Sequence, residues 1–172
     1  MNIKDAGELK ALQAPLKEKY RQEPKAALVT LRATGHAAEG VSCSVETGRA
    51  LVKAGLHPAS GGDGTFVCSG DMLLQALVAC AGVTLRAVAT SLGLNVEDAI
   101  VTAEGDLDFR GTLGVSREAS VGFRDIRLRF ELAGSLSDEE RATLVRLTER
   151  YCVVLQTLRQ APPVAVTATT AG

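Results

Sequence analysis

The chain has 172 residues, of which 46% are hydrophobic and 23% are charged, and this composition excludes a disordered chain. Its 19 Lys and Arg residues are balanced by 20 Asp and Glu residues, and the net charge of −1 excludes a general electrostatic attraction to nucleic acid or to an anionic membrane. With no Trp, two Tyr and four Phe, the chain has few rings on which single-stranded nucleic acid stacks.

The first 25 residues predict a helical extension. Leucines and one tyrosine recur at helical spacing between residues 6 and 21, and Pro24 ends the pattern. The chain starts with a charged segment and not with the apolar core of a signal peptide, so we expect a cytoplasmic protein. We therefore expect an N-terminal helical extension over residues 1–25 and one domain over residues 26–172.

Alternation of apolar and polar residues predicts strands in the domain. The alternating segments are residues 27–31, 41–45, 101–110, 126–132 and 164–167. The first two flank a predicted turn at residues 34–40 and form a hairpin. The third and fourth are long and half-exposed, which is typical of antiparallel strands.

Two stretches at helical spacing predict the main helices. Residues 70–92 are apolar nearly all round, so we expect this helix to be buried on most sides by sheets or by a second subunit. Its most apolar run, residues 72–85, is shorter than the roughly 20 residues of a membrane span. The second helix begins at the capping box of Ser137 and Glu140 and continues to Pro162. The order of elements predicts an α+β fold with mainly antiparallel sheets.

Four cysteines, Cys43, Cys68, Cys80 and Cys152, lie without the C-x-x-C spacing of a redox or zinc motif. Cys80 and Cys152 fall in the middle of the two predicted long helices. Each is explained as a small buried core residue, or, if the helices pair, as half of a redox couple. Alternation places Cys43 in the core, whereas Cys68 precedes the first long helix, where the helix dipole favours a thiolate.

Two motifs resemble those of the OsmC/Ohr family. The run SGDMLLQALVAC, which ends at Cys80, and the later run ATSLGL are similar to the family's first-cysteine helix, P-x-E/D-L-L-x-A-L-x-x-C followed by A-x-x-L-G. The run ERYCVVLQTL around Cys152 is similar to the second-cysteine motif, E-R-x-C-P-V-x-x-T-L. The resemblance extends over residues 26–168. It implies an OsmC-like fold, an intertwined homodimer in which antiparallel sheets wrap two central helices of each chain.

The resemblance also implies a thiol-dependent peroxidase of the oxidative stress response, with no cofactor and no metal. Cys80 would attack the distal oxygen of an organic hydroperoxide and become a sulfenic acid. Cys152 would condense with it to a disulfide. A thiol reductant, either a lipoylated protein or another dithiol, would reopen that disulfide.

The sequence departs from the family at the groups that activate the first cysteine. A thiol with a pKa near 8.5 is mostly protonated at neutral pH, and a cysteine in the middle of a helix gains nothing from a helix N-terminus, so we expect a side chain to activate Cys80. The resemblance implies an Arg in the first hairpin and a Glu ten residues before Cys80. The hairpin turn has no Arg, Gly70 stands at the Glu position with Asp71 next to it, and Val153 replaces the Pro of the second motif.

Four side chains are candidates for this supporting role: Asp71, Arg110, Arg49 and His57. Arg86 lies six residues from Cys80 on the same helix, which points it to another face. His57, Asp63 and Cys68 share a Gly-rich connection, but their spacing matches no zinc pattern, so we expect loop residues there and no metal.

A second function belongs to a different class. The chain would then be a catalytically silent OsmC-like dimer that binds an apolar small ligand at the subunit interface. An Arg or His in contact with Cys80 and a lowered Cys80 pKa would support the peroxidase. An apolar shell around Cys80 with a distant Cys152 would support the binding protein.

Overall fold

The computed structural model describes residues 5–8, 10, 11, 13, 14, 22, 34–38, 42–46, 51–114 and 116–170. Its strands are β1 (Thr34–Ala38), β2 (Ser42–Glu46), β3 (Leu51–Gly55), β4 (Val67–Cys68), β5 (Asp98–Leu107) and β6 (Phe123–Ala133). Its helices are the 3-10 turn η2 (Pro58–Ser60), α2 (Ser69–Leu92), α3 (Phe109–Thr112), α4 (Asp138–Tyr151) and α5 (Val153–Arg159). The described residues between 6 and 14 are also helical. This mixture of helices and strands confirms the predicted α+β class.

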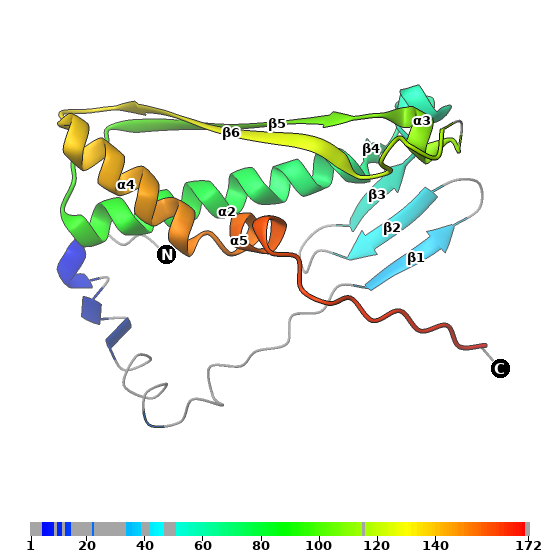
Figure 1. Cartoon of the computed structure of the whole chain (residues 1–172). Helices are drawn as coiled ribbons and strands as arrows, with labels where there is room; N and C mark the ends of the chain where they lie inside the picture. Colours follow the sequence, from blue (N-terminus) through cyan, green and yellow to red (C-terminus); the bar gives the residue numbers. More distant parts are fainter. Residues whose placement is uncertain are drawn as a thin grey trace.

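The strands form two sheets. In the first, with the order β1-β2-β3-β4, neighbouring strands are antiparallel except for the parallel pair β3 and β4. In the second, β5 and β6 form a long antiparallel pair that runs along α2 (Figure 1). The two long antiparallel strands are therefore confirmed, although β5 ends at Leu107 because Asp108 caps the short helix α3.

Helix α2 contacts β5, α4 and α5. The residues that it buries recur every four positions and form one stripe: Leu77, Ala81, Leu85 and Ala89. Leu144 of α4 and Leu155 of α5 pack against this stripe, and burial of one such leucine side chain stabilises the fold by about 1.5–3 kcal/mol. Gly93 ends α2 in the left-handed conformation with φ 68°, as its place after the apolar pattern predicts.

The opposite face of α2 is open to solvent in the single chain. Val83 is 73% exposed on this face, and Ala76 and Ala79 are exposed beside it. Leu73 and Leu92 are half-exposed at the two ends of the buried stripe. The predicted burial on most sides therefore does not come from the chain's own sheets. The whole helix also exceeds the 14-residue run considered above: by length and composition it could cross a membrane, with a mean hydropathy of 1.8, although the core helix of a soluble protein passes the same test.

A hairpin forms in this region, but its first strand, β1, lies where the turn was predicted. The predicted turn, residues 34–40, contains β1, because Ala37 pairs with Cys43 and Ala38 with Ser42. Only residues 39–41 then connect the strands, which is a common hairpin length. The predicted strand at residues 27–31 lies outside the described residues.

The second long helix is not continuous, which corrects the prediction. Cys152 has an extended backbone, with φ −71° and ψ 105°, and separates α4 from α5. Its N–H still donates to Thr148 O, and the side chain of Gln156 donates to the otherwise free carbonyl of Glu149 at 2.7 Å. These bonds compensate for the break in the helical ladder.

The predicted last strand at residues 164–167 is wrong. These residues are extended but form no strand, because the exposed tail has no hydrogen-bonded strand beside it within the described chain (Figure 1). Val164 and Val166 of this tail are largely exposed.

Candidate active site

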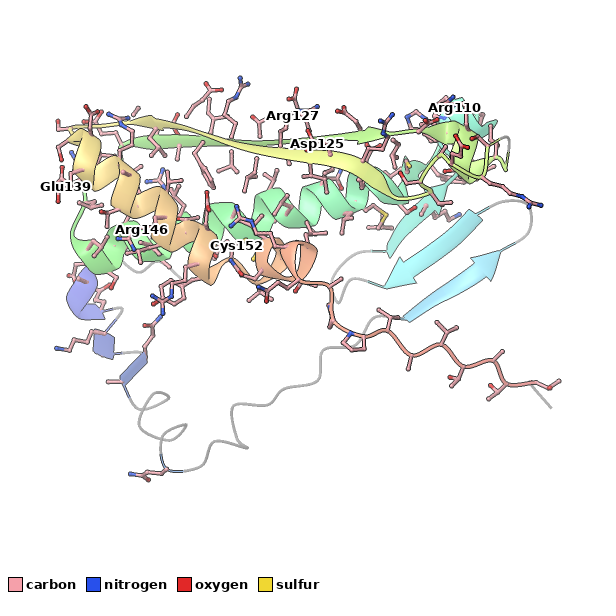
Figure 2. All side chains as sticks on the ribbon, in the orientation of Figure 1. Arg110, Asp125, Arg127, Glu139, Arg146 and Cys152 are labelled. Atoms are coloured by element: carbon pink, nitrogen blue, oxygen red, sulfur yellow. The ribbon has the colours of Figure 1, made fainter. Side chains whose placement is uncertain are left out.

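The structure brings Cys80 and Cys152 together. Cys80 lies in the middle of α2 and is half-buried, whereas Cys152 lies at the α4–α5 junction and is fully buried (Figure 2). Both are free thiols, Cys80 packs against the buried cluster that contains Cys152, and each side chain influences the pKa of the other. The partial exposure of Cys80 makes its sulfur the more accessible of the pair.

Backbone amides of α5 act on the Cys80 sulfur. The break at Cys152 starts a new helix, and the first N–H groups of a helix have no partner within it. Two of these groups, from Val153 and Val154, lower the pKa of the Cys80 thiol. The expectation that Cys80 gains nothing from a helix N-terminus is therefore wrong. That expectation took account of α2, which carries Cys80, but not of α5, which begins beside it.

The environment of Cys80 lowers its pKa. Burial disfavours the thiolate, but it is outweighed by hydrogen bonds from the Val154 amide, the Cys152 thiol, the Val153 amide and the Thr84 side chain. None of these largest influences is a charged side chain. The thiolate form of Cys80 is thus favoured by uncharged groups.

The environment of Cys152 acts in the opposite direction. Burial raises its pKa first, and the hydrogen bond and the charge of the neighbouring Cys80 raise it further. The amides of Leu155 and Val154 offset only part of this effect. The pair is therefore asymmetric, with Cys80 as the favoured thiolate and Cys152 as the thiol that donates to it.

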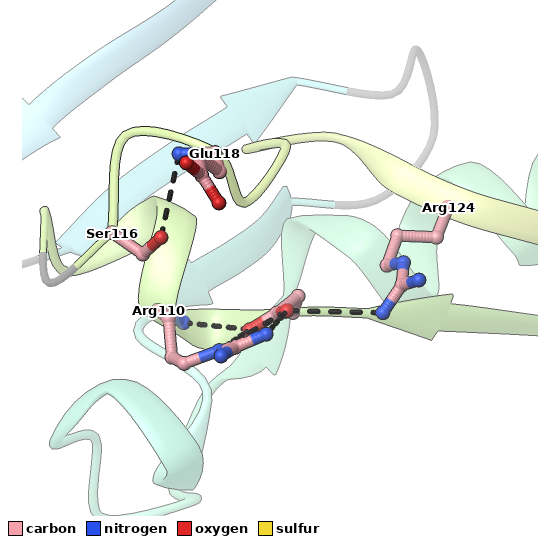
Figure 3. A network of polar contacts seen from close by, with 5 residues as sticks. Arg110, Ser116, Glu118 and Arg124 are labelled. Carbon is pink, nitrogen blue, oxygen red and sulfur yellow. Dashed lines mark hydrogen bonds and ion pairs between the residues drawn. The ribbon is translucent and has the colours of Figure 1, made fainter.

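Arg110 points away from the cysteines. Its guanidinium donates to both carboxylate oxygens of Asp108, at 2.6 to 3.2 Å, and Arg124 lies 3.8 Å from the same carboxylate (Figure 3). Arg110 holds the pKa of Asp108 down at about 2. Figure 2 shows Arg110 at the far end of the β5–β6 layer from Cys152.

The structure does not bring Asp71 or His57 to Cys80 either. Asp71 lies in the first turn of α2, nine residues before Cys80, which is about 14 Å along a helix. His57 accepts a hydrogen bond from the Ala59 amide through Nδ1 and stacks on Phe109 with a centroid distance of 4.9 Å. Arg49 lies outside the described residues. Arg86 donates to Val96 O at 2.6 Å, which agrees with its predicted position on another face.

A cavity of about 370 Å³ lies at the start of α2. His57, Cys68, Gly70 and Phe123 are among the residues that line it. A Cβ atom at Gly70 would lie 3.4 Å from the Phe123 ring and 3.6 Å from the Cys68 sulfur, which is ordinary contact. The glycine at the family's Glu position therefore leaves open space that a side chain would fill. In the part of the chain that is described, no three His, Cys, Asp or Glu side chains converge on a metal site.

Three groups at the site were not predicted: the Thr84 side chain and the amides of Val153 and Val154. The position of Thr84, four residues after Cys80, is a signal that could have identified it, because residues four apart share a helix face. The two amides carried no such signal, since their availability depends on a helix break that the apolar pattern does not show.

The OsmC-like protein family matches residues 62–167 of the chain. Among solved structures, an OsmC-like protein of Mycoplasma pneumoniae is 16% identical with a TM-score of 0.66, over 77% of this chain and 89% of that one. An organic hydroperoxide resistance protein of Legionella pneumophila is 22% identical with a TM-score of 0.62, over 78% and 92%. The organic hydroperoxide resistance protein OhrB of Bacillus subtilis is 18% identical with a TM-score of 0.55, over 78% and 94%. No curated protein sequence matches the chain.

At these identities the solved structures establish the fold, which is the predicted α+β, OsmC-like one. The family match is independent of them. It spans more than half of the chain and includes α2 with Cys80 and the α4–α5 junction with Cys152. The chain belongs to the OsmC-like protein family.

Proposed function

We propose that the protein is a thiol-dependent peroxidase that reduces organic hydroperoxides with Cys80 and Cys152. The observation that carries this proposal is the packing of half-buried Cys80 against the cluster that contains buried Cys152, with the pKa of Cys80 lowered and that of Cys152 raised. Similarity to proteins named for organic hydroperoxide resistance supports the substrate class.

In the first step the Cys80 thiolate attacks the distal oxygen of the hydroperoxide. A sulfur–oxygen bond forms, the oxygen–oxygen bond breaks, and the leaving alkoxide takes a proton from water to become an alcohol. Cys80 becomes a sulfenic acid. A low pKa serves this step because only the thiolate is the nucleophile.

In the second step Cys152 attacks the sulfur of the sulfenic acid. The disulfide forms, and hydroxide leaves with the Cys152 proton as water, so the two thiols supply the two electrons that the hydroperoxide accepts. The packing of Cys80 against the cluster that contains Cys152 supports this step. A dithiol or a lipoylated protein would restore both thiols by disulfide exchange.

We further propose that the protein works as a cytoplasmic homodimer without a cofactor or a metal. The open face of α2, with the exposed Ala76, Ala79 and Val83, supports a second subunit in this position. The predicted dimer would cover this face.

The second candidate function is a silent dimer that binds an apolar ligand. It is favoured by the apolar residues packed around Cys80 and by the absence of a charged side chain among the largest influences on its pKa. The contact between Cys80 and Cys152 favours the peroxidase, because a binding protein has no need of an asymmetric thiol pair.

A stoichiometric titration tests the proposal. The reduced protein is mixed with cumene hydroperoxide, and free thiols and intact mass are read before and after. We expect loss of two thiols and a mass decrease of about 2 Da, which is abolished in Cys80→Ser. Cys152→Ser should stop at the sulfenic acid, and Cys68→Ser, as the matched control, should react like the unmodified protein. Survival of all thiols in equimolar hydroperoxide would contradict the peroxidase and favour the binding protein.

A further inference from the structure

The cavity at the start of α2 is lined by residues from several parts of one chain. The loop after β3 contributes His57, α2 contributes Gly70, α3 contributes Phe109, and β6 contributes Phe123, with Cys68 at the junction of β4 and α2. Its volume is about 370 Å³. An apolar cavity of about 150 Å³ holds benzene, so this cavity has room for a substituted aromatic ring.

Packing and hydrogen bonds fix the rings in the cavity walls. The His57 ring stacks on Phe109 with a centroid distance of 4.9 Å, and its Nδ1 accepts the Ala59 amide at 3.0 Å. The Phe123 ring lies against β5 at Gly105, where a Cβ atom would come within 2.5 Å of it. The absence of a side chain at Gly105 thus allows the ring to stay in this position. The cavity is therefore formed before any ligand arrives, which lowers the entropic cost of binding.

The lining is uncharged and mainly apolar. No Asp, Glu, Lys or Arg is among the described residues that line the cavity, and leucine, valine and phenylalanine side chains supply its apolar surface. The polar side chains are few and include those of His57, Ser69 and Thr112. Because Nδ1 of His57 accepts the Ala59 amide, the neutral ring carries its proton on Nε2 as a donor. A charged ligand would lose its hydration here without gaining an ionic partner.

A second cavity of about 360 Å³, between β6 and the helices α4 and α5, has a different lining. It includes four charged side chains: Arg124, Asp125, Glu149 and Arg159. Water solvates such groups well, so this second cavity gives no comparable preference for an uncharged ligand.

We propose that the cavity at the start of α2 binds a small uncharged aromatic molecule with one hydrogen-bonding group, of which a phenol is the simplest example. Aromatic rings in the wall favour a ligand ring, because offset and edge-to-face contacts between rings are attractive. This site goes beyond the proposed peroxidase function. Cys68 precedes Cys80 by twelve residues, which is about 18 Å along a helix, and the lining residues come from one chain and not from a subunit interface.

Gly70 provides the variant that fills the cavity. A Cβ atom there would make ordinary contacts, 3.4 Å from the Phe123 ring and 3.6 Å from the Cys68 sulfur, so a side chain fits and its further atoms occupy the cavity. We therefore expect Gly70→Leu to weaken binding by more than about tenfold. Ser91→Leu is the matched control, because it adds the same side chain at an exposed position near the other end of α2.

The experiment measures binding of p-cresol to the full-length reduced protein at pH 7 by equilibrium dialysis. We expect one molecule to bind per chain in the unmodified protein and in Ser91→Leu, and the charged 4-methylbenzoate to bind at least about tenfold more weakly. Absence of p-cresol binding overturns the proposal, as does equal binding of 4-methylbenzoate or undiminished binding in a folded Gly70→Leu.

A second measurement needs no variant. Alkylation of Cys68 and Cys80 by iodoacetamide is followed by peptide mass in the unmodified protein, with and without saturating p-cresol. A ligand in the cavity covers the Cys68 sulfur, so we expect alkylation of Cys68 to slow several-fold and that of Cys80 to stay the same. Equal protection of both cysteines, or protection of neither, contradicts a site at the start of α2.

Discussion

At the scale of single residues, the site depends on a difference between two chemically identical side chains. Cys80 accepts several hydrogen bonds on a half-exposed sulfur, and Cys152 is enclosed and donates one. The same contact lowers one pKa and raises the other, because a hydrogen bond to a thiolate stabilises the charge on the acceptor and holds the proton on the donor. In the proposed cycle Cys80 therefore reacts first, with the hydroperoxide, and Cys152 reacts second, with the sulfenic acid.

Replacement of Cys152 by alanine tests the asymmetry. The loss of the thiol donor should raise the pKa of Cys80, so that alkylation of Cys80 at neutral pH slows by about three- to tenfold. Cys152→Ser keeps a donor at the same position and should lie between alanine and the unmodified protein. Equal midpoints of the alkylation profiles in Cys152→Ala and the unmodified protein would show that the two side chains do not interact.

A substitution of Arg110 tests whether this side chain activates Cys80. In Arg110→Gln the Asp108 carboxylate loses its main partner, and its pKa rises from about 2 toward the ordinary 3.8. A carboxylate with a lowered pKa stabilises the folded state above the unfolded pKa, and this contribution is lost as pH falls through about 2. The variant should therefore be slightly less stable than the unmodified protein at pH 7 and equal to it near pH 2.

Thermal unfolding at the two pH values measures this difference for Arg110→Gln. The Arg110 side chain is 65% exposed, so water screens the pair and the effect is small. The alkylation profile of Cys80 should be unchanged in this variant. A shift of that profile would place Arg110 in the supporting role that the sequence suggested.

At the scale of elements, the break between α4 and α5 is the feature that makes the site. Leu144, Leu147, Leu155 and Leu158 continue one apolar stripe across Cys152, so the sequence pattern predicts one helix. The stripe stays buried in spite of the break, and the Gln156 side chain binds the Glu149 carbonyl there. The sequence pattern alone therefore does not distinguish a kinked helix from a straight one.

Cys80 and Cys152 were predictable from their motifs, and Thr84 from its spacing. The Val153 and Val154 amides were not, because backbone donors leave no mark in a sequence.

Val153→Pro tests the role of the break directly. Val153 is the first residue of α5, where proline is favoured, its side chain is 70% exposed, and the extended Cys152 before it suits a following proline. The fold should therefore be retained, with an unchanged or slightly higher Tm. Proline has no N–H, so one donor to Cys80 is lost and its alkylation midpoint should move to higher pH.

Val153→Ala is the matched variant, because it shortens the side chain and keeps the amide. Its alkylation profile should match that of the unmodified protein. If Val153→Pro also leaves the profile in place, the Val153 amide does not act on Cys80, and the remaining donors account for its lowered pKa.

At the scale of the whole molecule, α2 is covered on one side by β5, α4 and α5 and open on the other. The all-round apolar pattern of residues 70–92 predicts more burial than one chain provides, but a sequence pattern does not identify what would supply it. A lipid bilayer, a second subunit and a folded-back segment would all bury the same side chains. We favour the second subunit, because the two cysteine motifs predict a homodimer and Val83 is exposed on the open face.

Val83→Asp decides this question, because Val83 lies near the middle of the open face and is 73% exposed in the single chain. The unmodified protein should elute with a mass near 36 kDa by light scattering, twice the 18.0 kDa of one chain. A charge buried at a subunit interface is costly, so the variant should dissociate toward 18.0 kDa at micromolar concentration. Val166→Asp, at an 89% exposed position in the tail, is the matched control and should keep the mass of the dimer. An unmodified protein that is monomeric in solution, or that is recovered only with membranes, would contradict the dimer and leave the apolar face of α2 to another partner.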